Sequence, residues 1–257
     1  YPLRRQRQMC IRDSFWAQLL TPSSAFLVGL GLTVAMAVSA EIIGLVLGLL
    51  FAQLRLSRRR VPRAIASLYI WAVRGTPLLV QIVFIYTGLA AAGIMHFSDI
   101  TFAGVTIPGN LQAGILALGL HEGAYMAEIF RAGIMAVDKG QTEAAKALGM
   151  PPMMLMRHVV LPQALRVILL PIGNQFNILL KNTTLVSVIG VSEMLLVTET
   201  INSATFRTFE LYAVLGIYFL ILTSAWTLFM GWVEKRLRLG RKSKILRIQA
   251  VAAAAES

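Results

Sequence analysis

Three long apolar runs dominate the pattern of hydrophobic and polar positions along the chain. Phe26–Ala52 is interrupted by a single charged residue, Glu41, whereas Leu78–Met95 and Leu211–Val233 contain no charged residue. A helix needs about 20 residues to cross a hydrocarbon layer of roughly 30 Å, and each run comes close to or exceeds that length. The pattern therefore predicts membrane-spanning helices.

Two further runs have a suitable length but contain polar side chains, Leu111–Met135 and Ala164–Val188. Their polar and charged residues are His121, Glu122, Glu128 and Arg131 in the first, and Asn174, Gln175, Asn177 and Lys181 in the second. Only helices and closed barrels satisfy the backbone in lipid, and runs without strict alternation are not barrel strands. We therefore expect an all-α fold, a polytopic membrane helix bundle of about five transmembrane helices formed by residues 15–236.

The composition agrees with a membrane protein. The chain of 257 residues is 57% hydrophobic and 14% charged, with a mean hydropathy of +0.70. Soluble domains are usually about 45–50% apolar and about 25% charged, so an ordinary soluble domain and a disordered chain are both excluded. The single cysteine excludes an internal disulfide framework, and no His/Cys/Asp/Glu cluster has the spacing of a metal site.

The net charge of +12 is distributed unevenly along the chain. Lys and Arg gather after the first apolar run, in residues 138–162 and after the last run, whereas residues 93–110 contain none. Because basic loops stay in the cytoplasm, we expect an outside N-terminus and a cytoplasmic C-terminus, with no nucleic-acid partner. The basic residues 1–14 disagree with this topology. We interpret them as a non-native or disordered tail, the alternative being a genuine basic tail, and we expect residues 237–257 to be a disordered basic tail.

The segment of residues 138–162 predicts a helix–turn–helix outside the membrane. Glu143–Leu148 is good helix-forming sequence, Gly149 can end that helix in a left-handed conformation, and Pro151 and Pro152 suit the first turn of a second helix. Four methionines in and after the turn give it an adaptable apolar surface. We interpret this segment as a docking element with no core of its own to fill.

The same segment resembles the EAA loop of ABC importer permeases. The matching residues are Glu143, Ala144, Ala145, Gly149, Leu161 and Pro162, with Val159 where the pattern has Ile. Three other stretches resemble the polar amino-acid (histidine/glutamine-type) family of these permeases: residues 74–81 (RGTPLLVQ), 123–129 (GAYMAEI) and 181–185 (KNTTL). The last departs mildly from the commoner KDTSL form. The resemblance covers roughly residues 26–236.

The resemblance implies that the chain works with partners in a bacterial inner membrane. The partners would be two cytoplasmic ABC ATPase subunits that bind ATP and Mg²⁺, a second copy or a sister permease, and an extracytoplasmic solute-binding protein that delivers the amino acid. The six EAA residues would couple this chain to the ATPase. The sequence adds that the chain has no Gly-Lys dipeptide and hence no phosphate-binding loop. We therefore expect a transporter subunit without cofactors, not an enzyme.

Charged groups within lipid usually face a cavity or a partner, so the polar residues of the spans are candidates for the substrate path. The candidates are Glu41, Glu122, Tyr125, Asn177 and Lys181. Glu122 and Tyr125 share a helix face and could receive an ammonium group, or could be a packing pair. Lys181 could bind a carboxylate or extend towards the interface, and Asn177 could line the path or join helices.

The remaining polar residues are open to structural explanations. Glu41 could line the path or be a buried partner of Arg74, and Arg74 itself is more simply an interfacial positive anchor. His121 on its own favours a structural role, and Glu128 with Arg131 favours a local ion pair. Gly44 and Gly48 predict a helix-packing face.

Two other functional classes compete with the ABC permease. A proton-coupled secondary amino-acid transporter could use Glu41, His121 and Glu122 as a proton relay, but such a transporter has no need of a docking loop. An intramembrane enzyme has no supporting motif. A requirement for ATP would separate the first two classes.

Overall fold

The computed structural model describes residues 15–102 and 104–237. The predictions made for residues 1–14 and 238–257 lie outside these described residues. Leu237, which we assigned to the disordered tail, is instead the last residue of a helix.

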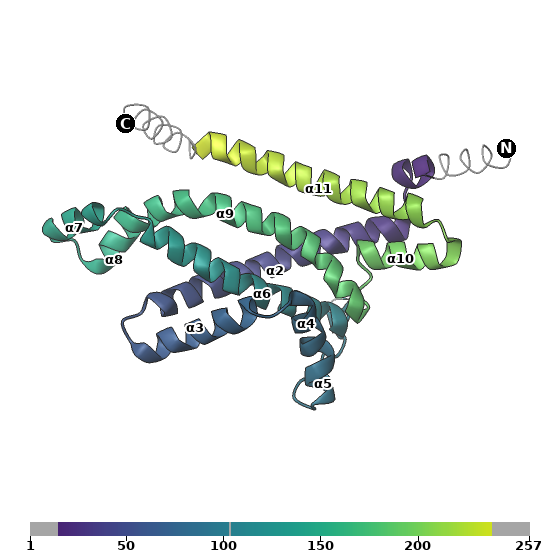
Figure 1. Cartoon of the computed structure of the whole chain (residues 1–257), viewed down its shortest axis with the longest axis horizontal. Helices are drawn as coiled ribbons and strands as arrows, with labels where there is room; N and C mark the ends of the chain where they lie inside the picture. Colours follow the sequence, from purple (N-terminus) through teal and green to yellow (C-terminus); the bar gives the residue numbers. More distant parts are fainter. Residues whose placement is uncertain (1–14, 103, 238–257) are drawn as a thin grey trace, which may run out of the picture.

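The described chain is a bundle of long helices joined by short ones (Figure 1). The longer helices are α2 (Ser24–Leu56), α3 (Arg60–Arg74), α6 (Gly109–Met135), α9 (Leu161–Asn182), α10 (Met194–Thr205) and α11 (Thr208–Leu237). The shorter elements are α4 (Leu78–Val83), the π-helical turn η1 (Phe84–Gly88), α5 (Leu89–Ala91), strands β1 (Ile100–Phe102) and β2 (Val105–Ile107), α7 (Lys139–Ala147), α8 (Pro152–Leu155), the π-helical turn η2 (Met156–Val160) and the 3₁₀ turn η3 (Thr183–Ile189). Residues 15–20 are also helical.

Helices α2 and α6 form the centre of the bundle and approach each other closely. A Cβ atom added at Gly44 would lie 2.7 Å from Cγ of Glu122, and one added at Gly48 would lie 2.3 Å from Cβ of Met126. Gly119 of α6 has the same relation to Ile43 of α2. Small residues allow this approach, so the helix-packing face predicted at Gly44 and Gly48 is confirmed.

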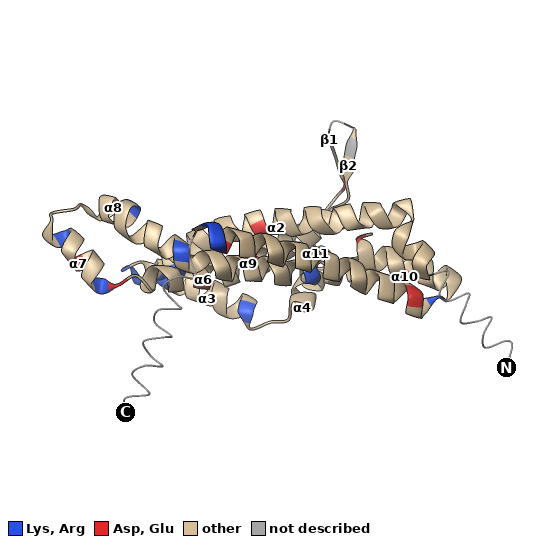
Figure 2. Cartoon of the chain, turned by 90° about the horizontal axis from the view of Figure 1, so that it is seen from above, with Lys and Arg blue, Asp and Glu red and all other residues tan. Residues whose placement is uncertain are grey.

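The two ends of the bundle differ in charge. Figure 2 shows Lys and Arg gathered towards the end that carries α7 and α8, and Figure 1 places the α2–α3 connection and the C-terminal end of α11 at that same end. Helix α10 and the start of α2 lie at the opposite end. The segments that we assigned to one side of the membrane therefore do share one end of the molecule.

Three helical segments of the described chain are long and apolar enough to cross a membrane, or four if a bent pair is counted as one span. The three are Ser24–Leu56, Pro152–Ile189 and Thr208–Leu237. Helix α6 is long enough at 27 residues, but its polar groups exclude it from this set. The count of five spans thus stays a prediction.

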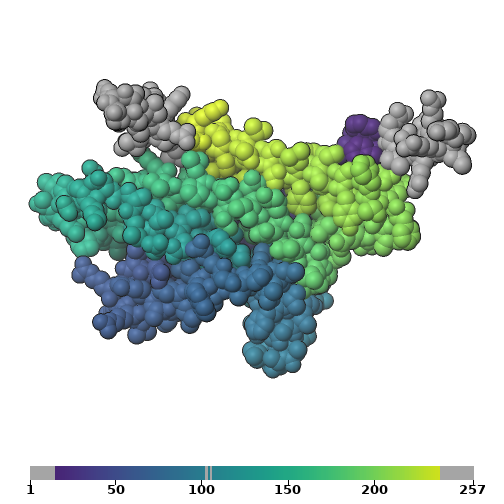
Figure 3. All heavy atoms as spheres, viewed as in Figure 1, coloured from purple at the N-terminus to yellow at the C-terminus, as the bar shows by residue number. Residues whose placement is uncertain are grey.

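The second predicted span is one half of a bent pair of helices. We expected a membrane-spanning helix over Leu78–Met95 after a basic loop. Helix α3 begins within that loop, the helical segment α4–α5 ends at Ala91, and the bend between the two is 106°. The break falls at Gly75, Thr76 and Pro77, because proline has no N–H to continue the helical ladder. Helices α4 and α5 leave the bundle as a lobe (Figures 1 and 3).

Two smaller features also differ from the prediction. The span expected over Ala164–Val188 ends as an α-helix at Asn182 and continues as the 3₁₀ turn η3. Strands β1 and β2 form an antiparallel hairpin, with Ile100 opposite Ile107, in a chain that we expected to be all-α. These strands have three residues each, which is too short to show an alternating pattern in sequence.

Candidate functional site

The break between α3 and α4 is held together by the side chain of Gln81. Its Nε2 donates to the carbonyl oxygens of Val73, at 2.7 Å, and Thr76, at 3.1 Å. Its Oε1 lies 3.1 Å from Nδ1 of His121 on α6, and accepts a hydrogen bond when that nitrogen carries the proton. Gln81 therefore satisfies backbone groups freed by the break and ties the break to α6. The sequence signal was a polar residue four positions after Pro77 in an apolar run, and we gave it no role.

An open groove of about 500 Å³ lies beside this break. It is lined by Arg74, Tyr125, Glu128, Ile129, Ala132, Gly133, Ala136, Val167, Ile168, Pro171 and Gln175. The Arg74 guanidinium carbon lies over the ring of Tyr125, 5.0 Å from its centroid. Two of the lining residues, Arg74 and Glu128, are charged, whereas most of the others are apolar side chains of α6 and α9.

The groove lies along the C-terminal half of α6. Tyr125 is 16 residues after Gly109 and 10 residues before Met135, the two ends of α6. At a rise of 1.5 Å per residue, these separations correspond to about 24 Å and about 15 Å. Arg74 is the last residue of α3 and is exposed, and its interpretation as an interfacial anchor stays a prediction.

Glu128 is already paired with arginine. Its Oε2 accepts from Nη2 of Arg131 at 2.7 Å and from Nε at 3.1 Å, and its Oε1 lies 4.0 Å from Nε of Arg55. The local ion pair predicted for Glu128 and Arg131 is confirmed. Arg74 also acts electrostatically on this carboxylate, so three arginines share one carboxylate and the net charge here is positive.

Two carboxylic acids lie behind the groove, in the interface between α2 and α6. Glu122 is completely buried, and its Oε2 accepts from Nε2 of Gln175 at 3.3 Å. Both oxygens of Glu41, Oε1 of Glu122 and Oδ1 of Asn177 are buried and find no hydrogen-bond partner among the described residues. The alternative in which Glu41 is a buried partner of Arg74 is therefore not observed among the described residues. Gln175 joins α9 to α6, and it connects Glu122 to the groove.

The structure brings together some of the predicted path residues and not others. Tyr125 lines the groove, and Glu122 reaches it through Gln175. The ring of His121 lies 5.0 Å from the ring of Tyr125, which with the bond to Gln81 gives it the structural role that we favoured. Lys181 is exposed in the last turn of α9 and is not among the residues lining the groove.

The segment between α6 and α9 has the predicted helix–turn–helix geometry. Helix α7 ends before Leu148, Gly149 follows with φ 73°, and Pro151 precedes α8. Leu148 is 81% exposed and Met153 is 79% exposed, whereas Ala145 is buried. Contrary to our expectation, the segment has a small core of its own, formed by Val137, Ala145, Leu155, Val160 and Ala164. Glu143, Ala144, Leu161 and Pro162 are exposed.

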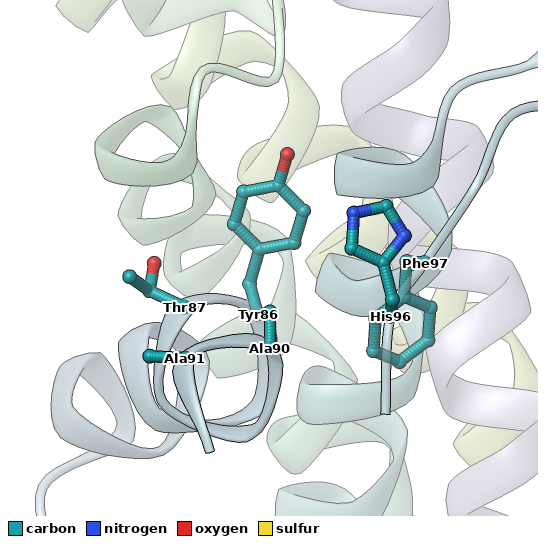
Figure 4. Close-up of a pocket in the computed structure, with 6 residues that line it drawn as sticks. All are labelled: Tyr86, Thr87, Ala90, Ala91, His96 and Phe97. Carbon is teal, nitrogen blue, oxygen red and sulfur yellow. The ribbon is translucent and has the colours of Figure 1, made fainter. Parts of the chain in front are cut away.

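A second cavity, of about 310 Å³, lies on the lobe formed by η1 and α5. Tyr86, Thr87, Ala90 and Ala91 line it from the helical side, and His96 and Phe97 line it from the segment that follows (Figure 4). None of its residues lines the groove, and no motif in the sequence indicated this cavity. Among the described residues, no group of three or more His, Cys, Asp or Glu could hold a metal ion.

The sequence profile of one protein family matches most of the chain. This family is described as "Binding-protein-dependent transport system inner membrane component", and the match covers residues 44–239. The chain belongs to this family. Its membership confirms the predicted class, a membrane transport subunit rather than an intramembrane enzyme, and the predicted fold class, a helical membrane bundle.

Individual relatives agree with the family. The arginine transport system permease protein ArgU of Corynebacterium glutamicum is 37% identical over 230 residues, which cover 88% of this chain and 72% of ArgU. The glutamine transport system permease protein GlnP of Escherichia coli K12 is 35% identical over 196 residues, which cover 76% of this chain and 85% of GlnP.

Solved structures also resemble this chain. A crystal structure of an amino acid ABC transporter with histidines has a TM-score of 0.76 and 38% identity, covering 85% of this chain and 97% of that one. An inward-facing structure of the MetNI methionine ABC transporter has a TM-score of 0.65 at 20% identity, covering 82% of this chain and 95% of that one, and supports the fold alone.

Proposed function

We propose that this chain is the permease subunit of an ATP-driven ABC importer for amino acids. The observation that carries the proposal is the α7–α8 element, which projects at the basic end of the bundle and presents Leu148 and Met153 to the outside. A self-powered transporter has no need of such an element. The resemblance of Glu143–Pro162 to an EAA loop supports a role in docking to an ATPase.

The groove beside the α3–α4 break is the proposed path for the substrate. It combines a cation, an aromatic ring and an amide, which together suit a zwitterion. Relatives of 35–37% identity are named as arginine and glutamine permeases, which supports an amino acid as substrate. Glu122 would meet the substrate ammonium only after Gln175 moves aside, because its side chain is fully buried.

The proposal includes the orientation and the partners. The α7–α8 end would face the cytoplasm of a bacterium, because basic segments are retained there. Two ATPase subunits that bind ATP and Mg²⁺ would dock at this end, and a solute-binding protein would deliver substrate to the opposite end. A second copy or a sister permease would complete the complex.

Substitution at Gly149 tests the coupling role. Its φ of 73° lies in the left-handed region, where a side chain with a Cβ is strained, so Gly149→Leu should distort the turn between α7 and α8. The variant should insert normally and lose copurification with the ATPase, or lose ATP hydrolysis stimulated by the binding protein in proteoliposomes. Gln141→Leu is the matched control, because it places the same side chain on the exposed surface of α7.

The outcome separates the competing functions. Normal stimulated hydrolysis and normal uptake by Gly149→Leu would remove α7–α8 from the mechanism. Uptake that needs a proton gradient but no ATP would instead favour the secondary transporter, with Glu41, His121 and Glu122 as its relay.

A further inference from the structure

The guanidinium of Arg74 is held in place without using its hydrogen-bond donors. Its contact within the described chain is the face of Tyr125, at 5.0 Å, and it makes no hydrogen bond or salt bridge with another described residue. The guanidinium group has five N–H donors in a planar fork. A cation–π contact orients that plane but leaves the donors at its edge available.

The position of Arg74 indicates what its free hydrogen-bond donors could bind. A charged side chain within the membrane is costly unless it meets a partner or water, and long side chains near helix ends can escape to the interface. Arg74 is the last residue of α3 and lies beside Tyr125, about 15 Å or more from either end of α6. Its side chain is exposed to the groove, where a bound group could reach it.

The other charge lining the groove, Glu128, interacts electrostatically with Arg74 but is shared among three arginines. Glu128 is occupied by Arg131, at 2.7 Å, and approached by Arg55, at 4.0 Å. The buried acids Glu41 and Glu122 are enclosed between α2 and α6 and do not line the groove. The groove therefore has an excess of positive charge at Arg74, which favours an anionic group.

The backbone beside Arg74 is unusually well fixed for a non-helical segment. Gln81 donates to the carbonyl oxygens of Val73 and Thr76, the residues on either side of Arg74 and Gly75. Thr76 Oγ1 donates in turn to the carbonyl oxygen of Ala72, at 2.9 Å. Rigid support of this kind gives a binding group a defined position.

We propose that Arg74 binds the α-carboxylate of the transported amino acid, through a bidentate pair of charge-assisted hydrogen bonds. This inference rests on the proposed function, since it assigns one end of the substrate to one residue of the groove. The fork of arginine matches the two oxygens of a carboxylate, whereas lysine offers a point charge. Arg74 would thus be a specificity-determining residue that distinguishes amino acids from amines of the same side chain.

Direct binding to the permease–ATPase complex in nanodiscs tests this assignment without the selectivity of the binding protein. The probes are radiolabelled L-arginine, L-glutamine and L-histidine, each competed by its own α-amide and by its decarboxylated amine. The wild-type complex should bind at least one acid and prefer it to both carboxylate-free analogues. Arg74→Gln should weaken binding of the acid by about 10- to 100-fold and leave the analogues unchanged, the effect of losing one charge-assisted pair.

Two further variants separate recognition from folding. Arg74→Lys keeps the charge and should bind with intermediate affinity, because the bidentate geometry is lost. Arg60→Gln removes an exposed charge from the first turn of the same helix and should bind like the wild type. The apparent melting temperature of each complex shows whether a loss of binding is a loss of structure.

The results that overturn the inference differ from those that overturn the proposed function. Equal weakening of acid, amide and amine by Arg74→Gln, or unchanged binding of the acid, would show that Arg74 does not read the carboxylate. A wild-type complex that imports amino acids but binds none of the probes would also reject the assignment. Failure of the wild type to import any amino acid with ATP would instead reject the proposed function.

Discussion

Gln81 offers the most direct test of how the chain tolerates a break within the membrane. Replacing it with leucine keeps a side chain of similar volume on α4 and removes both the amide donors and the acceptor. The carbonyl oxygens of Val73 and Thr76 would lose a donor at 2.7 and 3.1 Å, and His121 would lose its partner at 3.1 Å. Besides these three hydrogen bonds, the contact of Gln81 Nε2 with Thr76 Oγ1 at 2.9 Å disappears, and water can replace part of what is lost because Thr76 is exposed.

The expected cost follows from the number of bonds. Side-chain hydrogen bonds in membrane proteins contribute about 0.6 kcal/mol on average, and those in proteins generally contribute up to about 1.5 kcal/mol, so three bonds amount to roughly 2–4 kcal/mol. For a domain of this size, such a loss lowers the melting temperature by roughly 5–15 °C. Thermal unfolding of the purified permease–ATPase complex in detergent measures the shift.

Two comparison variants sharpen the result. Gln53→Leu makes the same chemical change at an exposed position on α2 and should leave the melting temperature within about 2 °C of the wild type. Gln81→Glu can still accept from His121 but presents a carboxylate to two carbonyl oxygens, so it should be at least as unstable as Gln81→Leu. Equal stability of Gln81→Leu and Gln53→Leu would refute the argument that Gln81 holds the break.

Three further predictions concern the bundle as a whole. Single cysteines at Ser98 and Gln141, in a background without the native cysteine, should react with an impermeant maleimide from opposite faces of the membrane. Labelling of both positions from the same face would contradict the predicted topology. Gly48→Leu should separate α2 from α6 and destabilise the protein by roughly 1–3 kcal/mol. Gly31→Leu on the same helix should be tolerated, because nothing lies within 4 Å of a Cβ atom added there. Similar melting temperatures of the two variants would disprove the packing argument. Glu122→Gln can keep its bond to Gln175 and should assemble normally but lower amino-acid uptake several-fold, and unchanged uptake kinetics would make this carboxylate structural.

Much of the fold could be predicted because the length of an apolar run and the spacing of glycines can be seen in one continuous stretch of sequence. Helices α2, α6 and α11 lie close to the apolar runs that indicate them. The form of the second span could not be predicted in the same way. Arg60 and Arg63 made the segment of α3 look like a polar loop. The segment is an amphipathic helix that packs only part of its surface on the bundle. A proline shows where a helix can break, but not that the next helix turns through 106°.

The candidate site shows the same division between local and tertiary information. The ion pair of Glu128 and Arg131 follows from a separation of three residues on one helix, and the sequence predicted it correctly. The contacts of Gln81 with His121 and of Gln175 with Glu122 join residues 40 and 53 positions apart. No single-sequence pattern specifies such pairs, so amides that hold this site together were named without a role or with only a general one.

Arg74 shows why the position of a residue within the bundle could not be predicted from the sequence. In the chain it lies next to a glycine and a proline at the edge of an apolar run, where a positive residue usually marks the membrane interface. The break at Gly75–Pro77 moves that edge into the middle of the bundle, because α3 ends beside Tyr125 and α4 leaves at a large angle. The same residue then lies against Tyr125 in an open groove, where its exposed guanidinium can meet a ligand. Within the described chain Tyr125 orients it, but no carboxylate pairs with it, so the unpaired donors point to a ligand rather than to the fold.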